Sequence, residues 1–309
     1  MAELSFDFQK YIDQRKGADE ALAQSGEAYF YPGDQRVLRV LAKVTPVTLA
    51  VQATARLWRS RGGRELLSSA VKVSEKQRPE LYRTARQCAD RLSLALPAIY
   101  VVPELAGGKL AATLGTSEDA AIVLSAPLVE KLGAGELAFV IGHECGHVQS
   151  GHVVYMTALY FLTSAERQYL RWIVKPAVMA LRSWARRAEI SCDRAGLLCS
   201  RELAPSVGAL LRLELGALEL EAALDPVRYA EQEGEAPASP AAIVELQRLH
   251  PAMRARAAAL RLFAETHYYL KERGGNPRED EGKSLAWCDE RVKGLLSRLP
   301  KEDKTGVEG

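Results

Sequence analysis

Apolar residues recur at helical spacing along most of the chain. Between 79 and 94 they fall on one face, which predicts a helix that begins at Pro79 and buries that face. The same spacing predicts further helices over 203–224, 251–271 and 285–299. The chain is therefore expected to be mainly α-helical.

One region shows short, continuous apolar runs instead. Ala98–Val102, Leu110–Leu114 and Ala121–Ser125 are rich in β-branched or small apolar residues, and a polar turn at 115–119 separates the last two. Runs of this length with short connections predict strands in a hairpin or a small antiparallel sheet. The predicted fold class is therefore α+β, with the sheet just ahead of a long helix.

Breaks in the pattern divide the chain into three parts. Residues 1–75 are predicted to be helical, with breaks at 31–33 and 61–64, and show no evident chemistry. Residues 76–272 hold the predicted strands and most of the long helices. Residues 273–309 are predicted to form a short helix and a polar tail.

Composition limits the function classes. With 309 residues, 48% apolar and 26% charged, the chain resembles an ordinary globular protein, and its net charge of +2 favours no nucleic-acid partner. The first ten residues lack the apolar core of a signal peptide. No run reaches the roughly 18 apolar residues of a transmembrane helix, so only peripheral membrane contact stays open. Five cysteines without a Cys-x-x-Cys pair favour a reducing compartment, and we predict a cytoplasmic protein.

The strongest chemical signal is the sequence Gly-His-Glu-Cys-Gly-His at 142–147. On a helix, His143 and His147 are four residues apart, so both imidazoles leave the same face and can hold one metal ion. Glu144 is placed to act on a water molecule without binding the metal, which is the pattern of zinc peptidases.

A catalytic zinc ion usually takes three protein ligands, so a third is required. His152 lies nine residues after His143 and is better explained as a surface residue or a partner of a ligand. Cys145 and Cys192 are also candidates, although Cys145 faces away from the two histidines. Glu189 is the remaining candidate, and four residues later an Asp could hold the distal N–H of a histidine ligand.

These separated motifs resemble the gluzincin zinc metallopeptidases of the CAAX prenyl protease, HtpX and Oma family. H-E-x-x-H followed at long range by Glu-x-x-x-Asp at 189–193 is the gluzincin arrangement, and His250-Pro251 with Arg256 matches the family's H-P-x-x-x-x-R element. The resemblance covers roughly residues 76–270 and includes the apolar runs ahead of the motif, at 99–102, 111–115 and 122–125.

The resemblance implies a zincin-like metalloprotease fold with one Zn²⁺ per chain. In it, His143, His147 and Glu189 would bind zinc, and Glu144 would be the general base. Asp193 would orient His143, with Arg256 in the same supporting layer, and His250 would help to stabilise the oxyanion.

The resemblance also implies how substrate binds. An extended peptide would add as a strand to the sheet edge formed by Leu110, Ala111, Ala112, Thr113 and Leu114. The family usually has an Asn at the position of Leu110, so any role of that Asn is not carried over.

The predicted function is a zinc-dependent endopeptidase that hydrolyses extended or unfolded polypeptides, with metal-activated water and a Glu base. Two alternatives remain: a zinc-binding protein without turnover, and a membrane-associated quality-control scaffold with little turnover. Val153–Arg187, between the second His and Glu189, is expected to form a helical hairpin beside or over the cleft.

Overall fold

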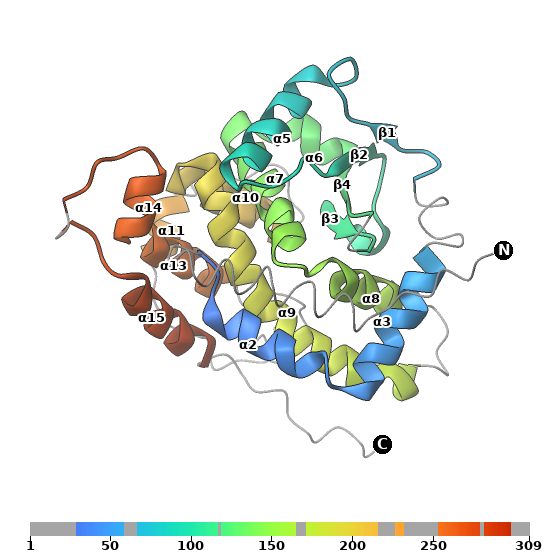
Figure 1. Cartoon of the computed structure of the whole chain (residues 1–309). Helices are drawn as coiled ribbons and strands as arrows, with labels where there is room; N and C mark the ends of the chain where they lie inside the picture. The colour runs from blue at the N-terminus through green and yellow to red at the C-terminus, as the bar shows by residue number, and fades with distance from the viewer. Residues whose placement is uncertain are drawn as a thin grey trace.

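The computed structural model describes residues 29–58, 67–116, 119–164, 171–215, 226–231, 253–278 and 281–297. Most of these residues are helical, and the strands form one small sheet, which confirms the predicted α+β class (Figure 1). The helices are α2 (Pro32–Leu41), α3 (Thr45–Leu57), α5 (Pro79–Arg91), η2 (Ala106–Gly108), α6 (Ala126–Lys131), α7 (Ala134–Gln149), α8 (Val153–Ser164), α9 (Arg171–Ser200), α10 (Leu203–Leu215), α11 (Pro226–Glu231), α13 (Met253–Ala264), α14 (His267–Glu272) and α15 (Leu285–Ser297). The strands are β1 (Val71–Lys72), β2 (Ala98–Val102), β3 (Ala111–Leu114) and β4 (Ala121–Ser125).

The sheet is mixed: the predicted hairpin is present as β3 and β4, but the prediction of a wholly antiparallel sheet was wrong. Its strand order is β1-β2-β4-β3, with β3 antiparallel to β4 but β2 parallel to β4. After β2 the chain crosses to the sheet edge to form β3, and then turns back as β4 between β3 and β2. Every residue of β4 is buried, as expected for a central strand.

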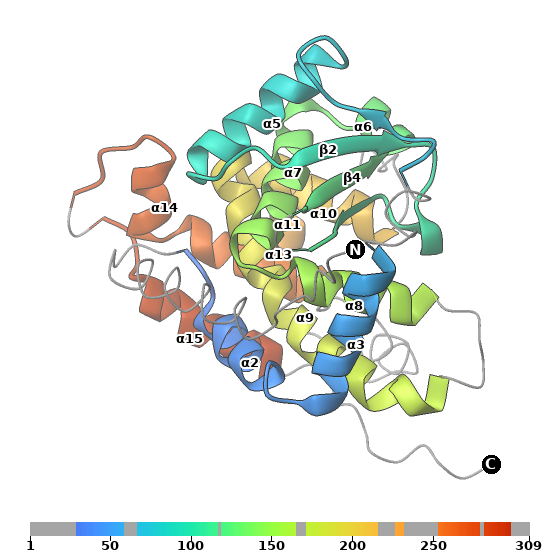
Figure 2. The ribbon, with the colours of Figure 1, turned by 45° about the vertical axis from the view of Figure 1, so that its right-hand side comes forward.

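Helix α7 lies between this sheet and α9 (Figures 1 and 2). Two glycines of α7 allow α9 to approach closely. A Cβ atom on Gly142 would lie 2.5 Å from Cys199 Cβ, and one on Gly146 would lie 2.9 Å from Ala195 Cβ. The glycines that flank the histidines therefore fix how near the two helices can come.

Helix α9 is a single helix of 30 residues. Its first half packs with α2, α3 and α8 around Trp184, which is fully buried. Its second half packs against α7. The predicted hairpin is thus present as α8 and the start of α9, and its tip at 165–170 lies outside the described residues.

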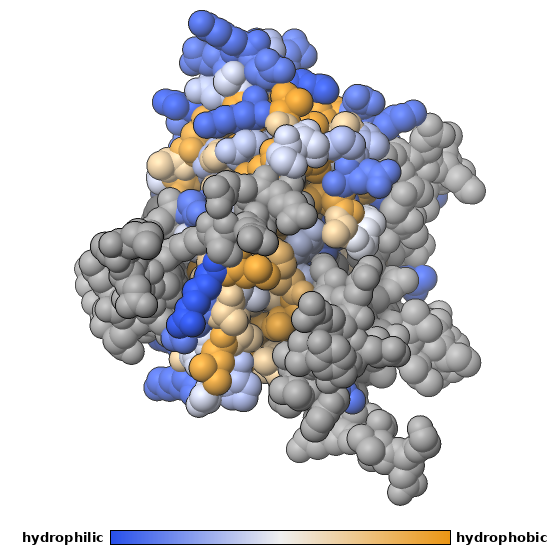
Figure 3. All heavy atoms as spheres, turned by 90° about the vertical axis from the view of Figure 1, so that its right-hand side faces the viewer, coloured by the Kyte–Doolittle hydropathy of each residue, from blue (hydrophilic) through white to orange (hydrophobic). Residues whose placement is uncertain are grey.

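In the part of the chain that the structure describes, no single helix has the length and apolar character to cross a membrane. Helices α2 and α3 meet that test only when taken together, and they bend by 88° at their junction. Val40, Leu49 and Leu57 on this pair are exposed large apolar residues. Figure 3 shows the side of the molecule that lies on the right in Figure 1, and hydrophobic side chains gather near the middle of this face.

Candidate active site

Helix α7 presents its two histidines to α9. The helix begins after Gly133, whose N–H donates to the Glu136 carboxylate, and Arg212 of α10 donates to the same carboxylate at 2.8 Å. His143 and His147 are both buried. Because the helix is fixed at its start and packed against α9 along its length, both rings have defined neighbours.

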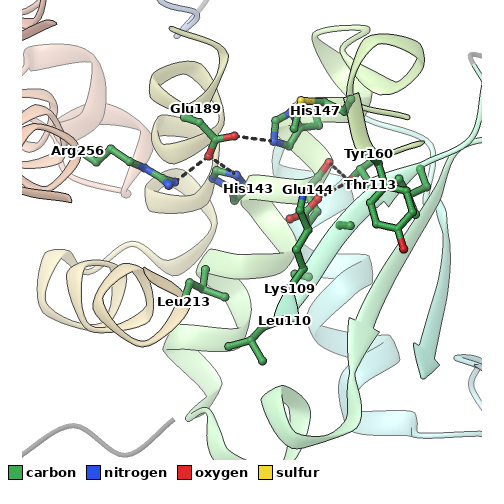
Figure 4. Close-up of a pocket in the computed structure, with 14 residues that line it drawn as sticks. Lys109, Leu110, Thr113, His143, Glu144, His147, Tyr160, Glu189, Leu213 and Arg256 are labelled. Atoms are coloured by element: carbon green, nitrogen blue, oxygen red, sulfur yellow. Dashed lines mark hydrogen bonds and ion pairs between the residues drawn. The ribbon is translucent and has the colours of Figure 1, made fainter. Parts of the chain in front are cut away.

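Both imidazoles direct Nε2 at Glu189 of α9 (Figure 4). His143 Nε2 lies 3.4 Å from Glu189 Oε2, and His147 Nε2 lies 3.7 Å from Glu189 Oε1. Donor atoms about 2.0–2.1 Å from a tetrahedral zinc ion are separated by about 3.3–3.4 Å; the His143 spacing matches this value, and the His147 spacing, to the other carboxylate oxygen, is slightly longer. The structure therefore brings together the three predicted zinc ligands.

Asp193 and Arg256 lie directly against this cluster. His143 Nδ1 lies 3.0 Å from Asp193 Oδ1, so its N–H can donate to that carboxylate and leave Nε2 for the metal. Arg256 of α13 donates two hydrogen bonds to Asp193, at 2.6 and 2.8 Å, and lies 3.1 Å from Glu189 Oε2. One buried guanidinium thus holds both carboxylates in place.

The site favours positive charge at the position of the histidines. Burial lowers the pKa of His143, but its hydrogen bonds with Asp193 and Glu189 raise it by more, to about 10. A cation beside these two carboxylates is therefore strongly stabilised. A divalent metal ion with nitrogen and oxygen ligands fits the chemistry of this donor set.

Glu144 points into the same cavity and is held by β3. Thr113 Oγ1 donates to Glu144 Oε2 at 2.5 Å. Burial raises the pKa of the Glu144 carboxyl, and nearby His143 and the Thr113 hydrogen bond offset part of that rise. Thr113 was predicted only as part of the substrate edge strand, and no local sequence pattern indicates its contact with Glu144.

The cavity has a volume of about 110 Å³ and lies between β3 and the metal cluster. The predicted edge strand lines it throughout, from Leu110 to Leu114, and β3 is the terminal strand of the described sheet. Lys109, Met156 and Tyr160 complete the walls on the α8 side, and Leu213 of α10 lies opposite.

The other candidate ligands occupy different positions. Cys145 is fully buried in the main core. Donor atoms of His143, His147 and Cys192 lie within 4.8 Å of one another, so a His-His-Cys set is a second arrangement that could hold a metal. His152 is fully buried, which excludes the surface alternative, and its Nδ1 lies 3.2 Å from His147 Nδ1, which agrees with the alternative of a partner of a ligand.

Two residues complete the account of the predicted site. His250, expected to stabilise the oxyanion, lies outside the described residues. Asp34 was not singled out by the sequence, yet it is fully buried behind the cluster and lies 3.0 Å from His152 Nε2. The sequence signal was weak, because an Asp in the first turn of a helix is usually explained by the helix dipole.

A buried H-E-x-x-H helix between a small sheet and a carboxylate-bearing helix defines the class as metallopeptidases of zincin-like fold. The model of the family described as Peptidase family M48 matches residues 75–264, and the chain belongs to this family. The resemblance expected from the motifs is thereby confirmed.

Individual relatives agree. The chain is 30% identical over 176 residues to the plastoglobule-localized metallopeptidase 48 of Arabidopsis thaliana, covering 54% of this chain and 49% of that protein. It is 35% identical over 82 residues to a protease HtpX homolog of Nostoc sp., covering 26% and 27%. It is 27% identical over 126 residues to a protease HtpX homolog of Streptococcus gordonii, covering 41% of this chain and 40% of that protein. The chain thus matches at most about half the length of these relatives, and no solved structure matches significantly.

Proposed function

We propose that the chain is a zinc-dependent endopeptidase that cleaves extended or unfolded polypeptides. The observation that carries the proposal is the convergence of His143 Nε2 and His147 Nε2 on Glu189, at 3.4 and 3.7 Å, beside the Glu144 carboxylate. Membership of a metallopeptidase family supports it.

Glu189 is the third ligand in this proposal, rather than Cys192. The Cys192 thiol lies 3.6 Å from His152 Nδ1, and His147 Nδ1 lies 3.2 Å from the same nitrogen. Cys192 is therefore on the Nδ1 side of the His147 ring, whereas Glu189 faces Nε2 of that ring. Burial raises the pKa of Cys192 well above its usual value, and the Glu189 charge raises it further. Metals bind the thiolate, so this environment disfavours Cys192 as a ligand.

In catalysis, the bound zinc would supply Lewis acidity that polarises the peptide carbonyl and lowers the pKa of water. Glu144 takes the proton from the attacking water and passes it to the leaving amine. Burial raises the pKa of this carboxyl, which makes it a better proton acceptor, and Thr113 fixes which oxygen is available by donating to the other. His250 is proposed to donate to the developing oxyanion.

The substrate is proposed to bind along β3. Ser125 N–H donates to Leu110 C=O, so that pair is hydrogen-bonded, and the pattern alternates along an antiparallel ladder. The N–H and C=O groups of Ala111 and Thr113 therefore point away from β4, toward the cavity side of the sheet edge. A peptide paired with these groups would be recognised through its main chain, which favours extended segments over one particular sequence.

Two further expectations remain proposals. All five cysteines are free and buried, which supports a reducing compartment such as the cytoplasm. The division at residues 75 and 272 is proposed as the extent of the metallopeptidase domain, and the family match at 75–264 supports it.

The test is hydrolysis of an unfolded protein such as casein by wild type and by Glu144→Gln, together with zinc content. The exposed Glu130→Gln serves as the matched control. We expect about one zinc per chain in all three proteins and loss of hydrolysis only in Glu144→Gln. Zinc binding without hydrolysis in wild type would instead favour the alternative of a zinc-binding protein without turnover.

A further inference from the structure

The metal cluster is backed by a buried polar chain that begins in α2, outside the residues that match the family. Asp34 is fully buried, accepts two hydrogen bonds and makes one ion-pair contact. Trp184 Nε1 donates to its Oδ1 at 2.9 Å, Ser191 Oγ donates to its Oδ2 at 2.8 Å, and His152 Nε2 lies 3.0 Å from Oδ2. The chain then continues from His152 to His147.

The proton positions along this chain follow from the donors and acceptors. An ionised carboxylate can only accept, and contact with His152 and the hydrogen bonds keep the pKa of Asp34 below its usual value despite the opposing effect of burial. His152 Nε2 lies 3.0 Å from Asp34 Oδ2, a charge contact outside hydrogen-bond geometry, and a neutral His152 places its proton on this nitrogen because the carboxylate cannot donate one. A neutral His152 then presents Nδ1 as an acceptor.

The next link is the 3.2 Å contact between His152 Nδ1 and His147 Nδ1. One of two imidazole nitrogens in contact must donate, so His147 carries its proton on Nδ1. Its Nε2, which faces Glu189, then offers a lone pair, as a metal ligand must. The edge-to-face ring contact between His152 and Trp184, with centroids 5.1 Å apart, holds the His152 ring in this orientation.

We propose that Asp34 and His152 are positioning residues that fix the tautomer and ring orientation of His147 as a metal ligand. This inference rests on the proposed zinc site with Glu189. It assigns a role in the metal centre to α2, which precedes the residues matched by the family. Asp193 contacts Nδ1 of His143 directly and orients that ring, whereas Asp34 acts on His147 through the intervening His152.

The substitution Asp34→Asn tests the chain with little change in shape. An Asn that keeps its oxygen toward Trp184 Nε1 turns its NH₂ group toward His152 Nε2, which must then accept. The protons of His152 and His147 would shift to the opposite nitrogens, and His147 Nε2 would lose its lone pair. Loss of such outer partners typically costs about 10–100-fold in metal affinity.

The matched control is Ser191→Ala, which removes another hydrogen bond to Asp34 but leaves the contact with His152 in place. Ser191 also accepts from Tyr31 N–H, so this control disturbs the same segment. Zinc affinity is measured by competition with a chromogenic chelator, beside the free energy of unfolding of the metal-free proteins. We expect about a 10–100-fold loss of affinity for Asp34→Asn and less than about 3-fold for Ser191→Ala. Asp34→Glu, which keeps the carboxylate, should recover part of the loss.

Imidazole ¹⁵N NMR of the zinc-loaded wild type reports which ring nitrogen of each histidine carries the proton, and a purely structural role of Asp34 makes no prediction about this. We expect protonated Nε2 on His152 and protonated Nδ1 on His147, and this measurement stands even if the Asp34 variants do not fold. A protonated His152 Nδ1, or equal affinity losses in Asp34→Asn and Ser191→Ala, would overturn the inference. If wild type binds no zinc, or Glu189→Ala binds it as tightly as wild type, the proposed function itself fails.

Discussion

The contact between α7 and α9 can be tested by adding one methyl group, through Gly146→Ala. The new Cβ would lie 2.9 Å from Ala195 Cβ and 3.1 Å from Cys192 Cα. Carbon atoms in contact are about 3.5–4.0 Å apart, so the helices must separate locally by roughly 0.6–1.1 Å for the first contact. The residue next to Gly146 is the proposed ligand His147, and Cys192 lies between Glu189 and Asp193 on the facing helix.

The effect on stability and the effect on metal binding should differ in size. Overpacking a core costs about 1–3 kcal/mol, and replacing Gly by Ala within a helix returns about 1 kcal/mol, so the net loss is about 0–2 kcal/mol. Metal sites tolerate ligand shifts of only about 0.2 Å, well below the required separation. We therefore expect zinc affinity to fall by on the order of 10–100-fold or more, while the protein stays folded.

The assay combines zinc competition with denaturant unfolding of the metal-free protein. Gly294→Ala in α15 is the control, because a Cβ there has nothing within 4 Å. It should leave zinc affinity unchanged and gain up to about 1 kcal/mol of stability. Unchanged zinc affinity in Gly146→Ala would refute the idea that this close approach sets the metal geometry.

Three further predictions follow from the site. Glu189→Ala should lose zinc whereas Cys192→Ala keeps it, as measured by metal content after dialysis; the reverse result would favour the His-His-Cys set. Ala111→Pro should raise KM for an extended peptide, because it removes an N–H that points away from β4, whereas Ala112→Pro should instead destabilise the sheet; an unchanged KM would argue against peptide addition along β3. Removal of zinc by a chelator should lower the melting temperature, since a ligand at 100 times its Kd adds about 2.7 kcal/mol; a melting curve unaffected by the chelator would contradict a zinc site in the folded protein.

The parts of the site that share one helix were predictable from the sequence. His143 and His147 follow from spacing on α7; the spacing of Glu189 and Asp193 on α9 made them candidates, and the family resemblance implied their roles. The three strands were found at nearly their observed bounds. The direction of β4 relative to β2 was not predicted correctly, because an apolar run shows burial but carries no information on direction or order.

Contacts between distant parts of the chain were the ones that sequence patterns missed. Asp34 and His152 are 118 positions apart, and nothing in the spacing of either residue indicates the other. Thr113 reaches Glu144 only because β3 lies against α7. Such pairs depend on tertiary packing, which a local pattern does not encode.

Thiol labelling of the buried cysteines in the α7–α9 contact can measure how often the two helices separate. Cys192 and Cys199 of α9 are buried in this contact, next to Gly146 and Gly142 of α7; burial raises the pKa of the Cys192 thiol, and a hydrogen bond with Cys88 together with burial raises the pKa of the Cys199 thiol. A thiol reagent can therefore modify them only in molecules where the two helices have separated. Since the same helices carry the proposed ligands, the labelling rate measures how often the metal centre comes apart, and bound zinc should slow it.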